Sequence, residues 1–196
     1  MASLWSLRER IAELDARADA AFDRLRGNPV ADRVFYSASA IGENSKVWMV
    51  LTVLRWLRGR PTDRFFAKRA WVAIFAESAI VNLGIKSMFR RSRPDHSGDH
   101  PFPLREPWTS SFPSGHATAA FCSATLLSEG DPVLAPAYFA LAGVVAASRI
   151  HVKMHHASDV LGGVAIGLAF GWLVRKIAPL PESHRGERSR DRARRR

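Results

Sequence analysis

Three short stretches of this 196-residue chain carry residue types that together could bind and cleave a phosphate ester. In chain order they are Lys86-x6-Arg93-Pro94, Pro113-Ser114-Gly115-His116 and Ser148-Arg149-x5-His155-x3-Asp159. They supply three fixed cations, a turn that contains glycine, and two histidines, one of which is followed by a carboxylate four residues later. A phosphomonoester carries close to two negative charges near neutral pH. Fixed cations can therefore hold it while an imidazole attacks the phosphorus.

The cationic side chains suit the binding of phosphate oxygens. Arg93 and Arg149 can each hold two oxygens through the planar guanidinium, and Lys86 adds a point charge from the end of its helix. Ser114 is a candidate N-cap, and Gly115 lets backbone N–H groups approach an anion at a helix N-terminus. Taken singly, Lys86 and Arg149 also fit ordinary roles at a helix end, such as snorkelling. It is the combination of the three stretches that indicates a site.

His155 is the residue that we expect to act as the nucleophile. Asp159 follows four positions later, so a helical turn places both side chains on one face. A carboxylate that accepts from one ring nitrogen fixes the tautomer and leaves the other nitrogen free to attack. His151 and His156 add two nearby imidazoles, but the adjacent cations disfavour a divalent ion. We therefore expect no metal and no other cofactor.

The elements that must position these residues have helical patterns. Apolar residues recur at steps of three and four from Leu4 to Leu25, which predicts an amphipathic helix ended by Gly27-Asn28-Pro29. The fate of Ala31–Glu43 is left open. Five further helices are predicted over 44–58, 66–88, 114–128, 133–149 and 157–177. No strand pattern competes with them.

The lengths of the apolar segments help to decide between a soluble helix bundle and one embedded in a membrane. Spanning the hydrocarbon needs about 17 to 20 apolar residues, and Pro132–Ser148 and Ala157–Val174 meet that length. The mean hydropathy of −0.10 is low, but the charges cluster near both ends of the chain. We predict an all-α, membrane-embedded antiparallel bundle of about five transmembrane helices, with the amphipathic helix at its N-terminus.

Alternating helix directions bring the three motifs to one end of this bundle. Basic residues collect at the opposite end, and the positive-inside rule puts that end in the cytoplasm. These residues are Arg58, Arg60, Arg64, Lys68, Arg69, Arg175 and Lys176. We therefore expect an integral protein of a bacterial plasma membrane, with the site on the outer face and the C-terminal tail in the cytoplasm.

The order and spacing of the motifs resemble the type 2 phosphatidic acid phosphatase superfamily, and every defining position is matched between residues 86 and 159. The resemblance implies a phosphohistidine at His155, Asp159 as its orienting carboxylate, and His116 as general acid toward the leaving alcohol. It also implies phosphate contacts from Lys86, Arg93, Ser114, Gly115 and Arg149. Two departures are His156, where relatives often carry an aromatic residue, and the lack of a clear first span.

The leading hypothesis is a lipid phosphate phosphatase that hydrolyses a phosphomonoester or diphosphate of a membrane lipid. Phosphatidate, phosphatidylglycerophosphate and polyprenyl phosphate or diphosphate are candidate substrates, and the sequence does not choose among them. One alternative is a soluble-type acid phosphatase of the same superfamily. A vanadate-dependent haloperoxidase is disfavoured by the chain's size and apolar runs. The alternative from another class is a non-catalytic basic protein that binds membranes.

Charge and cysteine content complete the predictions. The net charge is +11, and residues 182–196 hold seven arginines against three acids. Such a tail can bind anionic lipid or nucleic acid, but we expect a solvated, disordered end and no nucleic-acid partner. The single cysteine, Cys122, excludes an intrachain disulfide. The predicted parts are the amphipathic helix (1–29), the phosphatase bundle (30–179) and the basic tail (180–196).

Overall fold

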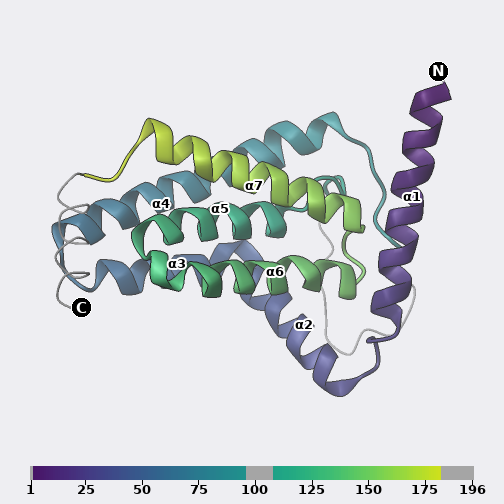
Figure 1. The fold of residues 1–196 in the computed structure, drawn as a ribbon, viewed down its shortest axis with the longest axis horizontal. Helices are drawn as coiled ribbons and strands as arrows, with labels where there is room; N and C mark the ends of the chain where they lie inside the picture. Colours follow the sequence, from purple (N-terminus) through teal and green to yellow (C-terminus); the bar gives the residue numbers. More distant parts are fainter. Residues whose placement is uncertain (1, 96–107, 182–196) are drawn as a thin grey trace.

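The computed structural model describes residues 2–95 and 108–181, and this part of the chain is helical (Figure 1). Its α-helices are α1 (Ala2–Asp23), α2 (Pro29–Gly42), α3 (Lys46–Trp56), α4 (Pro61–Ala79), α5 (Gly115–Gly130), α6 (Ala135–His151) and α7 (Ala157–Ile177). Short 3₁₀ or π turns adjoin them at η1 (Glu43–Ser45), η2 (Ile80–Gly84), η3 (Ile85–Met88) and η4 (Pro132–Leu134). The predicted all-α bundle is confirmed, and α1 stands across one end of it.

Helix α5 lies in the middle of the bundle, where it packs against α4, α6 and α7. Its sequence is rich in alanine, serine and threonine, so neighbouring helices can approach it on several sides. Larger side chains fill the remaining space: Trp48, Phe66, Leu126, Leu127 and Val145. Because α5 is held on several sides, the residues at its N-terminus have a fixed position.

Helix α7 approaches α5 closely because glycines face that helix at successive turns. A Cβ at Gly163 would lie 2.6 Å from the carbonyl oxygen of Ser114, and one at Gly167 would lie 2.4 Å from that of Thr118. Any larger side chain would push the two helices apart. The N–H of Ser114 also donates to the carbonyl oxygen of Asp159 at 3.0 Å. The first turns of α5 and α7, which carry two of the motifs, are thus joined directly.

The predicted helix over 66–88 begins earlier than expected, at Pro61, and its last turns are irregular. Hydrogen bonding changes to a π pattern in η2 and to a 3₁₀ pattern in η3. Such changes turn the following side chains relative to those of a regular helix. Here the π turn precedes Lys86, and the 3₁₀ turn contains this buried residue.

Three helical segments are long and apolar enough to cross a membrane: Pro61–Met88, Pro132–His151 and Ala157–Ile177. Helices α3 and α5, with 11 and 16 residues, fall short of the about 17 that a span needs. The described residues therefore support three spans by length and composition, whereas about five were predicted. The exact number of spans remains a prediction.

The N-terminal region forms two helices that lie outside the antiparallel bundle of α3–α7 (Figure 1). The predicted amphipathic helix is observed as α1. Asn28 accepts hydrogen bonds from the N–H groups of Val30 and Ala31, and so begins α2 in the segment that the sequence left open. The predicted boundaries near residues 29 and 179 remain predictions. From residue 182 onward the predicted basic tail lies outside the described residues.

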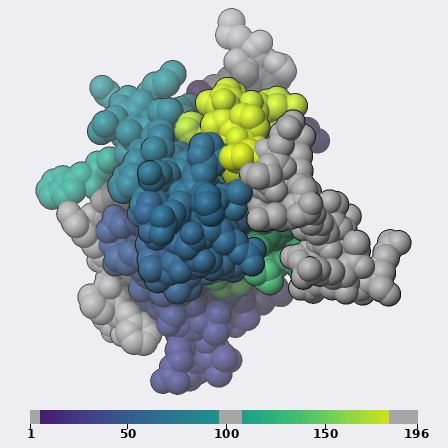
Figure 2. Space-filling view, turned by 90° about the vertical axis from the view of Figure 1, so that its left-hand side faces the viewer, coloured from purple at the N-terminus to yellow at the C-terminus, as the bar shows by residue number. Residues whose placement is uncertain are grey.

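At the end of the bundle remote from α1, buried arginines pair with carboxylates. Arg55 donates to Asp63 at 2.7 Å and to Asp131 at 2.9 Å. Arg69 donates to Glu129 at 2.5 Å. Figure 2 views this end, with the residues around the α3–α4 connection at its centre. These ion pairs fasten α3 and α4 to the connection between α5 and α6.

Candidate active site

The three motifs meet at the end of the bundle where α4 finishes and where α5 and α7 begin. A cavity of about 750 Å³ lies there. The predicted site residues that line it are Lys86, Gly115, His116, Arg149 and His155. Ser114 and Asp159 are fully buried behind the cavity wall, and Arg93 lies on the chain that leaves α4. The fold thus collects all eight predicted residues at one end, with five of them on one cavity.

Two of the cations enter the cavity from different helices. The Nζ atom of Lys86 lies 3.7 Å from the position that a Cβ on Gly115 would take, and donates to Thr109 Oγ1 at 3.4 Å. Arg149, near the end of α6, is buried and donates to the hydroxyl of Ser39 on α2. Among the described residues, no carboxylate forms an ion pair with Lys86 or Arg149. Both cations therefore remain available to an anion in the cavity.

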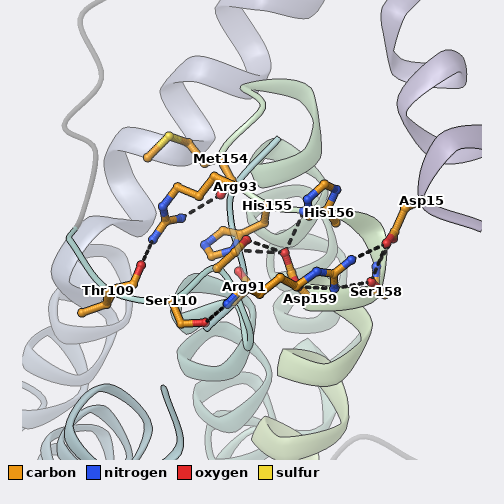
Figure 3. Close-up of polar contacts among 12 residues, drawn as sticks. Asp15, Arg91, Arg93, Thr109, Ser110, Met154, His155, His156, Ser158 and Asp159 are labelled. Atoms are coloured by element: carbon orange, nitrogen blue, oxygen red, sulfur yellow. Dashed lines mark hydrogen bonds and ion pairs between the residues drawn. The ribbon is translucent and has the colours of Figure 1, made fainter. Parts of the chain in front are cut away.

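Arg93 is held by backbone carbonyl groups beside the cavity (Figure 3). Its Nη1 donates to the carbonyl oxygen of Met154 at 2.7 Å, and its Nη2 donates to that of Thr109 at 3.1 Å. These bonds fix the guanidinium between the chain that follows α4 and the turn between α6 and α7. Arg93 is not among the residues that line the cavity, so its predicted phosphate contact remains a prediction.

His155 lies in the turn between α6 and α7, and its side chain is 3% exposed. The Nδ1 atom lies 3.8 Å from Asp159 Oδ2, which is too long for a hydrogen bond. The hydroxyl of Ser111 donates to Asp159 Oδ2 at 2.6 Å and lies 3.4 Å from His155 Nδ1. The structure thus brings the predicted pair together, with Ser111 beside both partners.

The protonation state of His155 follows from its burial. Burial lowers the pKa of its imidazole from 6.5 to about 4; the nearby carboxylate of Asp159 opposes this shift, and the positive charge of Arg149 reinforces it. The imidazole is therefore neutral at neutral pH. A neutral ring keeps the lone pair that a nucleophile needs.

Both oxygens of Asp159 accept hydrogen bonds (Figure 3). Oδ1 accepts from Arg91 Nη1 at 2.6 Å, while Oδ2 accepts from Ser111 and from the N–H of His156 at 2.9 Å. The bond from His156 closes the first turn of α7. These three bonds come from separate parts of the chain and hold the carboxylate in one orientation.

Four buried polar atoms around the site have no hydrogen-bond partner in the described part of the chain: Glu77 Oε2, Ser114 Oγ, His116 Nε2 and Arg149 Nε. Ser114 occupies the predicted N-cap position of α5, but its hydroxyl makes no capping bond. Each buried group left unpaired costs about 1–3 kcal/mol.

Sequence reasoning missed three residues that support the site. Arg91 holds Asp159, Ser111 bridges toward His155, and Ser39 holds Arg149. Arg91 and Ser111 each lie two residues before a motif position, so proximity was an available signal. Ser39 had none, because the sequence left its segment undecided. Within residues 2–95 and 108–181 no group of three or more His, Cys, Asp or Glu side chains could hold a metal ion.

Residues 67–181 match the sequence family described as the PAP2 superfamily, and this stretch contains every predicted site residue. The chain therefore belongs to the PAP2 superfamily, the group of phosphatases that its motif spacing resembles. This membership confirms the prediction of a phosphoric ester hydrolase of the membrane lipid phosphatase type.

Individual relatives sharpen that assignment. The chain is 34% identical over 144 residues to the decaprenylphosphoryl-5-phosphoribose phosphatase of Mycobacterium tuberculosis, covering 71% of this chain and 76% of the relative. Its fold is similar to that of the transmembrane PAP2 type phosphatidylglycerolphosphate phosphatase from Bacillus subtilis, with a TM-score of 0.60, 25% identity, and coverage of 90% and 96% of the two chains. It is also similar to Aquifex aeolicus LpxE, with a TM-score of 0.66, 25% identity, and coverage of 84% and 94%.

Proposed function

We propose that this chain hydrolyses a membrane lipid phosphate through a phosphohistidine on His155. In the first step His155 attacks phosphorus, the bond to the leaving oxygen breaks, and His116 gives that oxygen a proton. In the second step water attacks the phosphohistidine, His116 takes the water's proton, and inorganic phosphate leaves. Asp159, with Ser111, orients the nucleophile throughout.

We propose that the phosphate binds where two cations meet. The observation that carries this proposal is that Lys86 and Arg149 both line the cavity and that neither forms an ion pair with a carboxylate of the described residues. Two such cations at one cavity are complementary to a dianion with several acceptor oxygens. The proposed phosphate-binding set is Lys86, Arg93, Ser114, Gly115 and Arg149.

The cavity offers room for more than a phosphate group. At about 750 Å³ it falls in the range of sites that enclose a whole small ligand. The wall formed by α2, η1, α4 and η2 is rich in uncharged polar residues: Ser37, Asn44, Ser45, Ser78 and Asn82. A head group with several hydroxyls, such as a sugar or glycerol that carries the phosphate, suits this wall better than the bare diacylglycerol of phosphatidate.

The relatives support the same substrate class, since their names refer to a decaprenyl-linked ribose phosphate and to phosphatidylglycerolphosphate. Phosphate release from a polyprenyl phosphoribose phosphate, phosphatidylglycerophosphate and phosphatidate, all at equal surface density in one detergent, compares the three head groups. We expect the highest kcat/KM for a hydroxyl-bearing head group. A clear preference for phosphatidate would refute the head-group assignment.

We further propose that the site faces the outer side of a bacterial plasma membrane and that the tail is cytoplasmic. The basic cluster around the α3–α4 connection lies at the end opposite the site (Figure 2), as the positive-inside rule requires. Ser92 and Arg60 are exposed at the two ends, and the single cysteine is buried. A membrane-impermeant maleimide should label Ser92→Cys but not Arg60→Cys in intact cells. The reverse pattern would contradict this orientation.

Trapping of the intermediate tests the chemistry directly. Rapid quenching in alkaline detergent after mixing with ³²P-labelled substrate should leave label on the wild-type protein, and a bond to histidine is identified because the label survives alkali and is lost in acid. His155→Ala should give no label with any substrate. Label on His116, or label that persists in His155→Ala, would overturn the roles proposed here.

A further inference from the structure

Arg91 links the candidate catalytic carboxylate to the N-terminal helix (Figure 3). Its Nη1 donates to Asp159 Oδ1 at 2.6 Å, and its Nη2 donates to Asp15 Oδ2 on α1 at 2.6 Å. Arg91 does not line the cavity. Its guanidinium therefore lies between two carboxylates behind the site and takes no place among the groups that face the substrate.

Asp15 is tied to the start of α7 as well as to Arg91. Its Oδ1 accepts from the N–H of Ser158 at 2.8 Å, and its Oδ2 accepts from the Ser158 hydroxyl at 2.8 Å. The same hydroxyl accepts from Arg91 Nη1 at 2.7 Å. Asp15 is only 8% exposed. The contacts form a closed network in which Asp15, Arg91 and Ser158 each hold the other two.

Apolar packing of α1 is concentrated near its end, where Phe22 packs against Phe35 and His151. Leu7, Ile11 and Leu14 are between 36% and 52% exposed. Polar contacts also hold the helix at two places: the Asp15 network, and Arg26 just beyond α1, which pairs with Asp19 and donates to the carbonyl oxygens at the end of α6. The two places differ in one respect, since only the first reaches Asp159.

We propose that Arg91 and Asp15 are positioning residues for catalysis, and that α1 thereby forms part of the active-site machinery. The proposal rests on the roles given above to His155 and Asp159. Arg91 is the side chain that holds Asp159 Oδ1, so its loss lets the carboxylate turn about its Cβ–Cγ bond and weakens the orientation of His155. Asp15 acts one step further away, by fixing the guanidinium of Arg91 against Asp159.

Arg91→Gln tests the contact between Arg91 and Asp159. In metal sites, outer partners that orient a ligand are worth about 10- to 100-fold in activity, and we expect a loss of similar size in kcat here. KM and the inhibition constant for inorganic phosphate should stay near their wild-type values, because Arg91 does not face the cavity. Arg91→Lys keeps one donor and the charge, so it should recover part of the lost kcat. An equal loss in both variants, or a change confined to KM, would contradict the positioning role.

Asp15→Asn and Asp19→Asn form a matched pair that tests the contact between Asp15 and Arg91. Each removes one carboxylate from α1 and weakens one of its two attachments. We expect a severalfold loss of kcat in Asp15→Asn and wild-type kcat in Asp19→Asn, when both proteins are folded by their melting temperatures in detergent. The effects of Asp15→Asn and Arg91→Gln should be less than additive, because they break the same network.

The same measurements separate this proposal from the one on which it rests. If His155→Ala abolishes the phosphoenzyme while the Arg91 and Asp15 variants turn over like wild type, the positioning network is refuted and the site assignment stands. If Asp19→Asn lowers kcat as much as Asp15→Asn, α1 acts only through its attachment, and the network is again refuted. Phosphoenzyme formation in His155→Ala would instead refute the site itself.

Discussion

The two ends of the bundle both bury cationic side chains, but they differ in whether those side chains are paired with carboxylates. At the end remote from α1, Arg55 and Arg69 each meet carboxylates: Asp63 and Asp131 for the first, Glu129 for the second. Removing one partner from such a buried pair leaves an uncompensated charge and costs about 3–5 kcal/mol. These cations thus belong to the fold, because their charge is neutralised within it.

At the site end, the cations that line the cavity have no such partner among the described residues. Glu43 and Glu77 also line the cavity, yet neither forms an ion pair with Lys86 or Arg149. The carboxylate of Asp159 is paired with Arg91 instead. Buried cations that form no ion pair within the described part of the chain can pair with an anion from outside, and a phosphate dianion supplies one. The comparison separates residues that stabilise the bundle from residues that bind the substrate.

The largest effect on turnover after loss of the nucleophile is expected at His116. A general acid is worth about 10²–10⁴ in rate, so His116→Ala should lose that much activity on a lipid alcohol, which leaves poorly without a proton. A p-nitrophenyl ester leaves readily as the anion. Phosphoenzyme formation, measured after a rapid quench in alkaline detergent, should therefore fall much less with this ester. Equal losses on both substrates would show that His116 is not the acid.

Matched substitutions at two buried arginines test the comparison itself. Arg149→Met should lower kcat/KM by about 10²–10³, the cost of removing one donor to a developing charge, with little loss of thermal stability. Arg69→Met leaves Glu129 with only the more distant Arg175 at 3.7 Å, so it should lower the unfolding free energy by up to about 3 kcal/mol while the folded fraction stays active. Melting temperatures in detergent and rates normalised to folded protein separate the two. If both variants behave alike, the distinction between the two ends is wrong.

The helices and the candidate catalytic residues could be predicted from the sequence for a physical reason. Chemistry at a phosphate needs particular residue types at short spacings, and those spacings, such as the four residues from His155 to Asp159, are visible in the chain. The supporting contacts are not local. Ser39 lies 110 residues from Arg149, and Asp15 lies 76 residues from Arg91. No periodicity or spacing rule links such positions, because tertiary packing alone brings them together.

Low pH should destabilise the folded chain through protonation of His155. The unfolded imidazole takes up a proton near pH 6.5, whereas burial keeps it neutral in the folded chain down to about pH 4. The unfolded state therefore binds more protons between these values, and stability falls as the pH falls through them. A shift of this size corresponds to about 3 kcal/mol. His155→Asn should flatten that part of the dependence of melting temperature on pH, and an unchanged slope would contradict it.

The smallest effect on catalysis is expected from the C-terminal tail, since none of the predicted site residues lies in it. Two truncations sharpen this point at the end remote from the site. Arg69 Nη1 donates to the carbonyl oxygen of Ala178 at 2.7 Å, and a chain that ends at Pro181 keeps that bond, whereas one that ends at Ile177 loses it. A hydrogen bond from a charged donor is worth about 1.5–3 kcal/mol. We therefore expect the shorter chain to melt a few degrees lower and the longer one to match the full-length chain.

Both should keep their phosphatase activity when folded, because the bond that is lost stabilises the bundle and holds no substrate. Loss of activity in a folded chain ending at Pro181 would show that the tail contributes to the site.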